Sequence, residues 1–212
     1  MEIQAERLAY WYLRLNGFLT IPNFIVHPDQ GRNQGTDVDV LGVRFPYRSE
    51  LFPNPMQDAP VFASSKEKYG EKAFVALAEV KAGLCRLNGA WTEPDKQNMH
   101  RVLCALGVVP IQEVDTVATA IYEEGCYSNQ LYHVSMICIG KQENPDIANT
   151  YPQVPQITWD HVSRFIYQRF RDFYYRKVAH GQWDQQGQDL WNCAERNRRD
   201  IEGFVREVRI RG

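Results

Sequence analysis

Two short segments place acidic residues at spacings that could hold a divalent metal ion. Asp37 and Asp39 lie two residues apart in the run TDVDVLGVRF, and Glu79 and Lys81 lie two residues apart at the end of FVALAEVK. Side chains two residues apart on a β-strand point to the same face. If both runs are strands and pair as neighbours, three carboxylates and one ammonium group meet at one end of a sheet.

Such a cluster predicts a hydrolytic metal site. Gathered carboxylates repel one another and resist desolvation, so a bound cation is the usual compensation. Oxygen ligands favour Mg²⁺ or Mn²⁺ as the cofactor, and a lysine beside the ion can contact a scissile phosphate or the attacking water. The alternative is a set of ordinary acidic residues near strand ends, because E-x-K alone occurs by chance in most chains of this size.

The elements that must position these residues can be predicted from apolar spacing and end signals. A helix is expected near the N-terminus, ending at Gly17, with an apolar face at three-and-four spacing: Ala5, Leu8, Ala9, Tyr12 and Leu13. Strands are expected over residues 18–26, 36–45, 74–81 and 131–139. Pro22 suggests that the first of these is an edge strand or carries a bulge.

Further helices are expected between and after these strands. One would be capped by Thr92 and end at Gly107. A short one would span residues 115–124 and end at Gly125, and a long one would be capped by Thr158. The order predicts an α/β fold with a central mixed β-sheet flanked by helices. We expect a core at residues 1–140 with a Pro-rich insertion at 46–70, and a helical C-terminal extension at 141–212 packed on that core.

The two acidic segments also carry a family resemblance. GTDVDVL (35–41) followed by ALAEVK (76–81) resembles the paired catalytic motifs of the PD-(D/E)XK nuclease superfamily, which includes restriction endonucleases, Holliday-junction resolvases and RecB-type nuclease domains. ERLAYWYLRLNGF (6–18) is similar to the opening helix of the resolvase-like members. The resemblance covers residues 1–107, about half the chain. It implies a restriction endonuclease-like αβββαβ core and a metal-dependent nuclease that hydrolyses DNA.

Carried over position by position, the resemblance implies roles for individual residues. Asp39 would be the central metal ligand and Glu79 the second, and the carbonyl of Val80 could add a third oxygen. Lys81 would orient or activate the attacking water. Asp37 could replace Asp39, since the two are expected to share a face.

Two helical residues complete the site that the resemblance implies. Glu6 would reach in from the first helix as an auxiliary metal ligand. Gln97, on the helix after the E-V-K strand, matches a glutamine that contacts the site or the DNA backbone in some families. Because 40 positions separate Asp39 from Glu79, the Pro-rich insertion must loop out. The literal pair Pro28-Asp29 lies too early in the chain and is interpreted as a coincidence.

The bulk composition bounds the remaining possibilities. The net charge is −2, but residues from His161 onward hold 11 Lys/Arg against 7 Asp/Glu, which suggests a nucleic-acid-facing surface or a solvated helix face. The five cysteines form no C-x-x-C pair, which argues against a structural zinc site. Without a leader or an apolar run long enough for a membrane, the chain reads as cytoplasmic.

These observations leave two function classes. The first is a DNA-cutting enzyme, with a homodimer or a partner protein left open. The second is a catalytically silent module on the same fold that binds nucleic acid or protein. The low net charge favours the second class, because a stand-alone DNA enzyme usually presents more positive surface.

Overall fold

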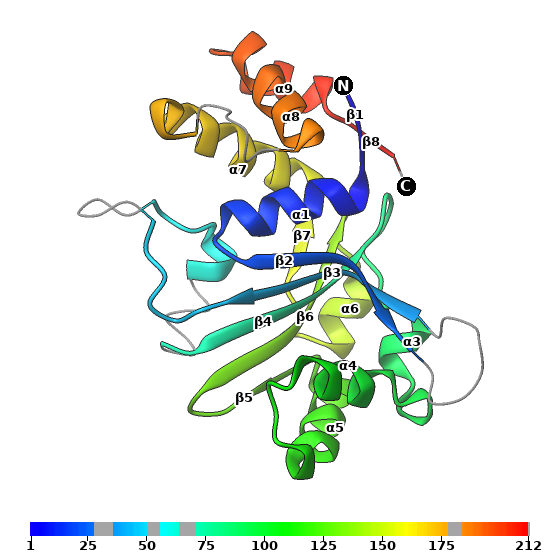
Figure 1. The fold of residues 1–212 in the computed structure, drawn as a ribbon. Coiled ribbons are helices and arrows are strands. Elements are labelled where there is room, and N and C mark those ends of the chain that lie inside the picture. The colour runs from blue at the N-terminus through cyan, green and yellow to red at the C-terminus, as the bar shows by residue number, and fades with distance from the viewer. Residues whose placement is uncertain (28–35, 51–55, 64–70, 178–183, 212) are drawn as a thin grey trace.

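The computed structural model describes residues 1–27, 36–50, 56–63, 71–177 and 184–211, and these form an α/β fold around one mixed sheet (Figure 1). The strand order is β2-β3-β4-β6-β5, and β7 pairs with the far end of β6. The strands of this sheet are β2 (Leu19–Val26), β3 (Thr36–Arg44), β4 (Ala73–Val80), β5 (Cys126–Ser128), β6 (Tyr132–Gly140) and β7 (Gln156–Thr158).

The directions of the strands follow from their connections. β3 runs antiparallel to both of its neighbours, β2 and β4, whereas β4 and β6 run parallel to each other. A parallel pair needs a long crossover, and the crossover here carries α4 (Asn98–Leu106) and α5 (Val114–Glu124). Every residue of β6 is buried, as expected for a strand covered on both faces. The predicted mixed sheet with flanking helices is therefore confirmed.

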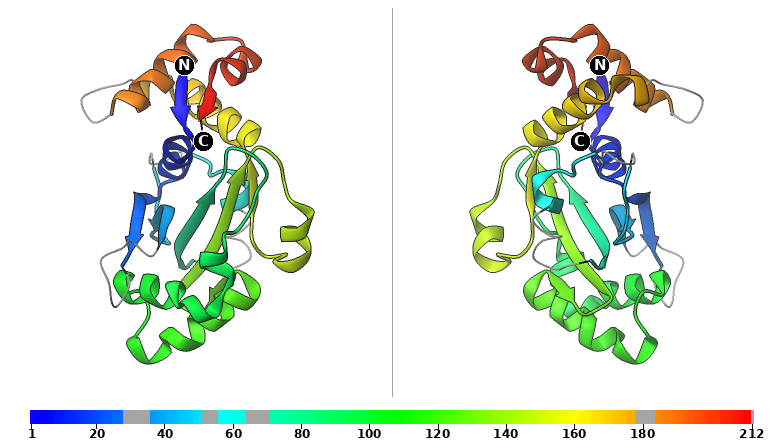
Figure 2. Two further views of the ribbon diagram at one scale, coloured as in Figure 1. Left: turned by 90° about the vertical axis from the view of Figure 1, so that its right-hand side faces the viewer. Right: turned by 90° about the vertical axis from the view of Figure 1, so that its left-hand side faces the viewer.

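Helices cover both faces of the sheet (Figure 2). α1 (Ala5–Leu15) and α7 (Trp159–Asp172) belong to one hydrophobic cluster, and α4 and α5 belong to the other. Shorter elements connect them: α3 (Gly89–Thr92), α6 (Pro145–Thr150), and the 3₁₀ turns η1 (Pro94–Lys96), η2 (Ile111–Glu113) and η3 (Tyr174–Arg176). None of the helices in the described part of the chain combines the length and apolarity needed to cross a membrane.

Several predicted helix ends are confirmed and one is wrong. Gly17, Gly107 and Gly125 follow α1, α4 and α5 with positive φ values of 82°, 62° and 78°, where glycine costs least. The hydroxyl of Thr158 caps α7 by accepting a hydrogen bond from the His161 N–H. Thr92, by contrast, ends α3 and does not cap the next helix, because η1 intervenes and α4 begins only at Asn98.

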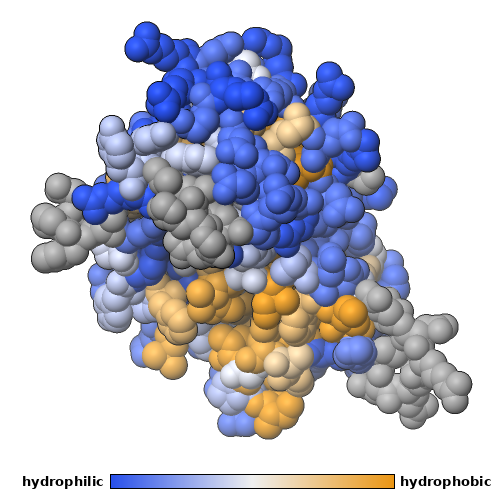
Figure 3. Space-filling view, turned by 45° about the horizontal axis from the view of Figure 1, so that its top comes forward, coloured by the Kyte–Doolittle hydropathy of each residue, from blue (hydrophilic) through white to orange (hydrophobic). Residues whose placement is uncertain are grey.

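β2 lies at one edge of the sheet, as Pro22 in its sequence suggested. Leu19, Ile21 and Ile25 are 66%, 51% and 44% exposed on it. Figure 3 shows one face of the molecule, on which hydrophobic residues gather in the lower half and hydrophilic residues cover most of the upper half. β2 continues through Pro22, which has no N–H to donate, and through the left-handed Asn23 (φ 51°), and both residues limit pairing with another edge.

The segment after Gly140 contains helices and also two strands. α7, α8 (Gln185–Arg196) and α9 (Ile201–Glu207) stack beside α1. β7 extends the central sheet, and β8 (Arg209–Arg211) pairs in parallel with β1 (Glu2–Gln4) at the N-terminus. The domain boundary at residue 140 stays a prediction. Within the insertion, residues 60–63 form a helical turn, and residues 51–55 and 64–70 lie outside the described part.

Candidate active site

The register of β3 and β4 sets two of the predicted residues opposite each other. The antiparallel ladder ends at the pair Val40–Ala78, and Asp39 and Glu79 are the next residues beyond that end on the two strands. The carboxylate of Asp39 reaches across and its Oδ2 accepts a hydrogen bond of 2.6 Å from the Val80 N–H. The structure therefore confirms that the two strands are neighbours and that these acidic residues meet.

Lys81 lies between the two carboxylates. Its Nζ is 2.5 Å from Glu79 Oε1 and 3.6 Å from Asp39 Oδ2. The same Nζ donates to the Val80 carbonyl at 3.0 Å, so this oxygen faces the cluster too. The Lys81 backbone is held on both sides, by its N–H to Ile139 O at 2.8 Å and by its carbonyl, which accepts from Trp159 Nε1 at 3.0 Å.

Glu79 is the most deeply buried member, with 2% of its surface exposed. Its carboxylate accepts hydrogen bonds from Lys81, from Asn88 Nδ2 and from the Trp91 side chain. Burial raises the pKa of Glu79 to about 7, and the charge of Asp39 adds to the rise, while Lys81 and Trp91 oppose it. At neutral pH this side chain therefore lies close to its midpoint of ionisation in the metal-free protein.

The pKa of Asp39 is raised for the same main reason, desolvation by burial. The Val80 N–H and the charge of Lys81 lower the pKa, whereas the charges of Asp37 and Glu6 raise it further. Glu6 sits in the first turn of α1. Its electrostatic effect on Asp39 shows that α1 brings a further carboxylate into the neighbourhood of the site.

Of the two aspartates on β3, Asp39 makes the contacts. Among the described residues it alone of the pair bonds to Val80 and lies within ion-pair distance of Lys81. The predicted alternation around them holds only in part. Val40 packs beneath α1, as do Ala78 and Val80, whereas Val38 packs against the α4 and α5 side. The change of face occurs at Asp39, which lies across from the left-handed Asn23 on β2.

Gln97, which the sequence placed in the site, does not contact Asp39, Glu79 or Lys81 through any hydrogen bond or ion pair of the described residues. It is exposed at the start of α4 with a left-handed backbone (φ 52°). The helix was expected to begin at Thr92, which would have placed Gln97 inside a helix, but η1 occupies that turn.

Three residues that contact the site were missed by sequence reasoning. Asn88 and Trp91 bond to Glu79, and Trp159 bonds to the Lys81 carbonyl. Asn88 precedes Gly89, and an Asn-Gly pair usually indicates a turn, so its sequence context hides this role. Trp159 lies 78 positions from Lys81, and no local pattern could connect the two.

The oxygens that face Lys81 suit a hard divalent cation by type, since two come from carboxylates and one from a carbonyl. No group of three or more His, Cys, Asp or Glu residues in the described segments is arranged to hold a metal by itself. A metal-binding set at this point therefore depends on the Val80 carbonyl as well as on Asp39 and Glu79.

Comparisons of the chain with protein-family models, with curated proteins and with solved structures gave no match.

Proposed function

We propose that the protein is a metal-dependent nuclease that hydrolyses phosphodiester bonds in DNA. The observation that carries the proposal is the position of Lys81 Nζ, 2.5 Å from Glu79 and 3.6 Å from Asp39, with the Val80 carbonyl beside it. Two carboxylates from adjacent strands, a backbone oxygen and one amine are the groups that metal-assisted phosphodiester hydrolysis uses.

The arrangement of elements supports the same proposal. Apart from the three-residue strand β5, which precedes β6, α1 is followed by the antiparallel strands β2, β3 and β4, then by helices, and then by β6 parallel to β4. This is the order expected of a restriction endonuclease-like αβββαβ core. We therefore propose that the chain has this fold and belongs to the PD-(D/E)XK superfamily.

Each residue has a distinct proposed role. Asp39, Glu79 and the Val80 carbonyl would hold Mg²⁺ or Mn²⁺, and Glu6 would assist from α1. The bound ion would stabilise negative charge developing on the phosphate and lower the pKa of a water. Lys81 would leave its ion pair with Glu79 to orient the attacking water or contact the scissile phosphate.

Cleavage of DNA with added Mn²⁺ or Mg²⁺ tests the proposal. We expect Asp39→Asn, Glu79→Gln and Lys81→Met each to abolish cutting, because each removes one part of the site at nearly constant volume. Asp115→Asn is the matched control, since Asp115 is 92% exposed and pairs with His100 away from the site. Cutting that persists in both Glu79→Gln and Lys81→Met would refute the assignment.

One observation favours a second candidate, a catalytically silent module that binds nucleic acid or protein. Glu79 already accepts hydrogen bonds from Lys81, Asn88 and Trp91, so its carboxylate is satisfied without a metal. Ligand binding to the native state raises the melting temperature. A rise with millimolar Mn²⁺ that is lost in Asp39→Asn supports the enzyme, and an unchanged melting temperature supports the silent module.

A further inference from the structure

Two hollows are each lined by residues of both α1 and the edge strand β2, which lie side by side in opposite directions (Figure 1). We call the two hollows together the α1–β2 groove. The arginine hollow, of about 600 Å³, is lined by Tyr10, Arg14, Gly17–Thr20 and Arg48–Glu50. The amide hollow, of about 590 Å³, is lined by Gln4, Glu6, Arg7, Pro22, Asn23 and Asp184–Gln186.

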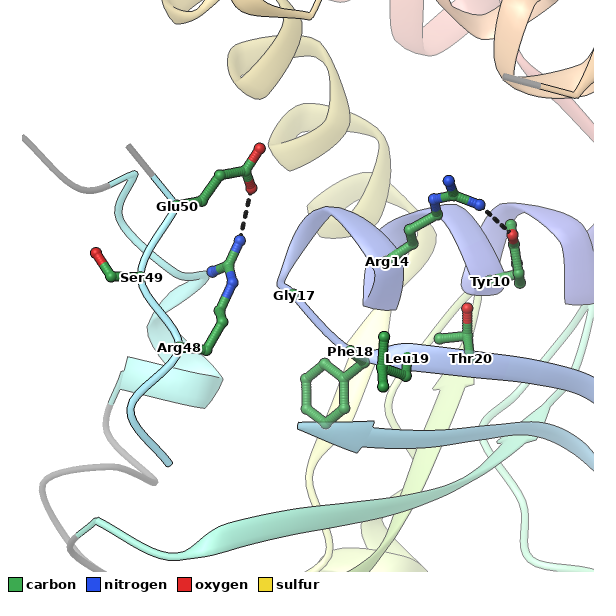
Figure 4. A pocket seen from close by; sticks show the side chains of 9 residues that line it. All are labelled: Tyr10, Arg14, Gly17, Phe18, Leu19, Thr20, Arg48, Ser49 and Glu50. Carbon is green, nitrogen blue, oxygen red and sulfur yellow. Dashed lines mark hydrogen bonds and ion pairs between the residues drawn. The ribbon is translucent and has the colours of Figure 1, made fainter. Parts of the chain in front are cut away.

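The arginine hollow offers one available cation (Figure 4). Arg14 donates to Tyr10 Oη at 2.6 Å and its guanidinium lies 5.0 Å from the Trp11 ring, and no acidic partner for it occurs in the described segments. Arg48 across the hollow is already occupied by Glu50 at 2.7 Å and Asp58 at 3.0 Å. A guanidinium held by aromatic neighbours and free of carboxylates is suited to bind a phosphate.

The amide hollow has a different chemistry. Four carboxamides line it, from Gln4, Asn23, Gln185 and Gln186. The charge of Arg7 is matched by Asp184, and its Nε donates to Gln186 Oε1 at 2.9 Å. Glu6 also lines the hollow, and no ion pair joins it to another residue of the described segments; its carboxylate disfavours a phosphate. Carboxamides both donate and accept hydrogen bonds, as the edges of nucleobases do.

The amide hollow adjoins the candidate active site. Asn23 lies across from Asp39 on the neighbouring strand, between the pairs Pro22–Val40 and Phe24–Val38. Glu6 lines the hollow and also acts electrostatically on Asp39. A chain that followed the groove from Arg14 toward Asn23 would therefore end beside the carboxylates.

We propose that the α1–β2 groove binds one strand of a nucleic acid, with a backbone phosphate at Arg14 and a nucleobase at the carboxamides of the amide hollow. The inference rests on the proposed function for its substrate class. Beyond the proposed function, it gives the path of the nucleic-acid strand across the surface. Along that path, the arginine hollow binds a phosphate and the amide hollow recognises a base.

Binding of a fluorescein-labelled single-stranded oligonucleotide, followed by anisotropy in EDTA over a series of salt concentrations, tests the path. We expect Arg14→Gln to weaken binding and to reduce the slope of log K against log salt by about 0.7, because one phosphate contact is lost. Gln185→Ala should weaken binding about 2- to 10-fold and leave the slope unchanged, because a neutral hydrogen bond to a base is lost.

Two matched variants control for charge and for the helix. Arg199→Gln removes an exposed arginine from the basic C-terminal segment, and Gln188→Ala removes a glutamine one turn along α8 from Gln185 that does not line the hollow. Both should bind like the wild type. The path is overturned if Arg14→Gln leaves the slope unchanged, if Arg199→Gln reduces it equally, or if Gln185→Ala binds as Gln188→Ala does.

The two proposals fail separately because EDTA excludes hydrolysis. Binding that depends on Arg14, with no cleavage in Mn²⁺, would contradict the nuclease and support the groove. Cleavage in Mn²⁺ by an Arg14→Gln variant with unaltered binding would support the nuclease and contradict the groove.

Discussion

At the scale of single residues, Glu79 sets the chemistry of the site. It is almost fully buried, yet it accepts hydrogen bonds from a charged donor and from two neutral ones. A buried carboxylate is stable only if its oxygens are bonded in this way. The pairing with Lys81 was predictable from the E-x-K spacing. The contributions of Asn88 and Trp91 were not, because they depend on how the chain turns back after β4.

The raised pKa of Glu79 gives a pH dependence to the metal-free protein. Its pKa is about 7 when folded and 4.5 ordinarily, so between these values the folded state holds a proton that the unfolded state releases. This group therefore stabilises the fold most below pH 4.5 and loses that contribution as the pH rises to about 7. The raised pKa of Asp39 acts in the same direction.

We expect the melting temperature in EDTA to fall less across this pH window in Glu79→Gln than in the wild type, because the amide does not titrate. Glu124→Gln is the control, since Glu124 is exposed at the end of α5. Parallel melting curves against pH for the wild type and Glu79→Gln, measured by circular dichroism, would contradict the assignment.

Asn88→Ala should affect both the fold and the metal. Loss of a hydrogen bond to a buried carboxylate should lower the free energy of unfolding by about 1–3 kcal/mol, as measured in urea. The residue that orients a metal ligand typically contributes about 10- to 100-fold in metal affinity, so Mn²⁺ titration followed by electron paramagnetic resonance should show weakening in that range. The exposed Asn192→Ala should change neither quantity, and Mn²⁺ affinity that is equal in Asn88→Ala and the wild type would exclude the positioning role.

At the scale of elements, the strands were predictable because their apolar residues are dense and their ends are marked. β3 and β4 lie within one residue of their expected bounds. The faces were less predictable, because Val38 and Val40 pack on opposite sides of the sheet. Strict alternation assumes a regular strand, and the change of face lies at Asp39, across from the left-handed Asn23 on the neighbouring strand. The predicted start of the helix at Thr92 was wrong because the 3₁₀ turn η1 and the positive φ of Gln97 separate Thr92 from α4.

Asn23 should therefore tolerate glycine but not a β-branched residue. A φ of 51° is accessible to Asn and Gly, whereas valine there should cost about 1–2 kcal/mol in the free energy of unfolding. Thr20→Val on the same strand is the matched control, because the backbone of Thr20 does not have a positive φ. Urea denaturation of the three variants measures the difference, and equal stability of Asn23→Val and Asn23→Gly would show that the twist is not enforced by this residue.

At the scale of the whole molecule, the C-terminal segment is joined to the N-terminal part at several points. β8 pairs with β1, and α7 packs in the same cluster as α1. The Arg169 side chain, buried in α7, donates to the Gln57 carbonyl in the insertion, 112 positions away. The spacing of apolar residues within one helix or strand predicts which of its faces is buried. It does not predict which distant element packs against that face. This is why a helical extension could be predicted while its strands and its contact with the site could not.

Trp159 is the point where this C-terminal segment reaches the candidate site. It follows β7 at the start of α7, is 5% exposed, and donates from Nε1 to the Lys81 carbonyl at 3.0 Å. Trp159→Phe keeps an aromatic ring but leaves that carbonyl without this donor, so we expect a loss of about 1–3 kcal/mol in the free energy of unfolding measured in urea. If Lys81 acts in hydrolysis, its backbone must be fixed, and cleavage should fall by more than the unfolded fraction explains.

Trp191→Phe is the control, because Trp191 packs in α8 against Phe170 and Tyr174. Equal cleavage rates for folded Trp159→Phe and Trp191→Phe would show that the C-terminal segment stabilises the fold without positioning Lys81.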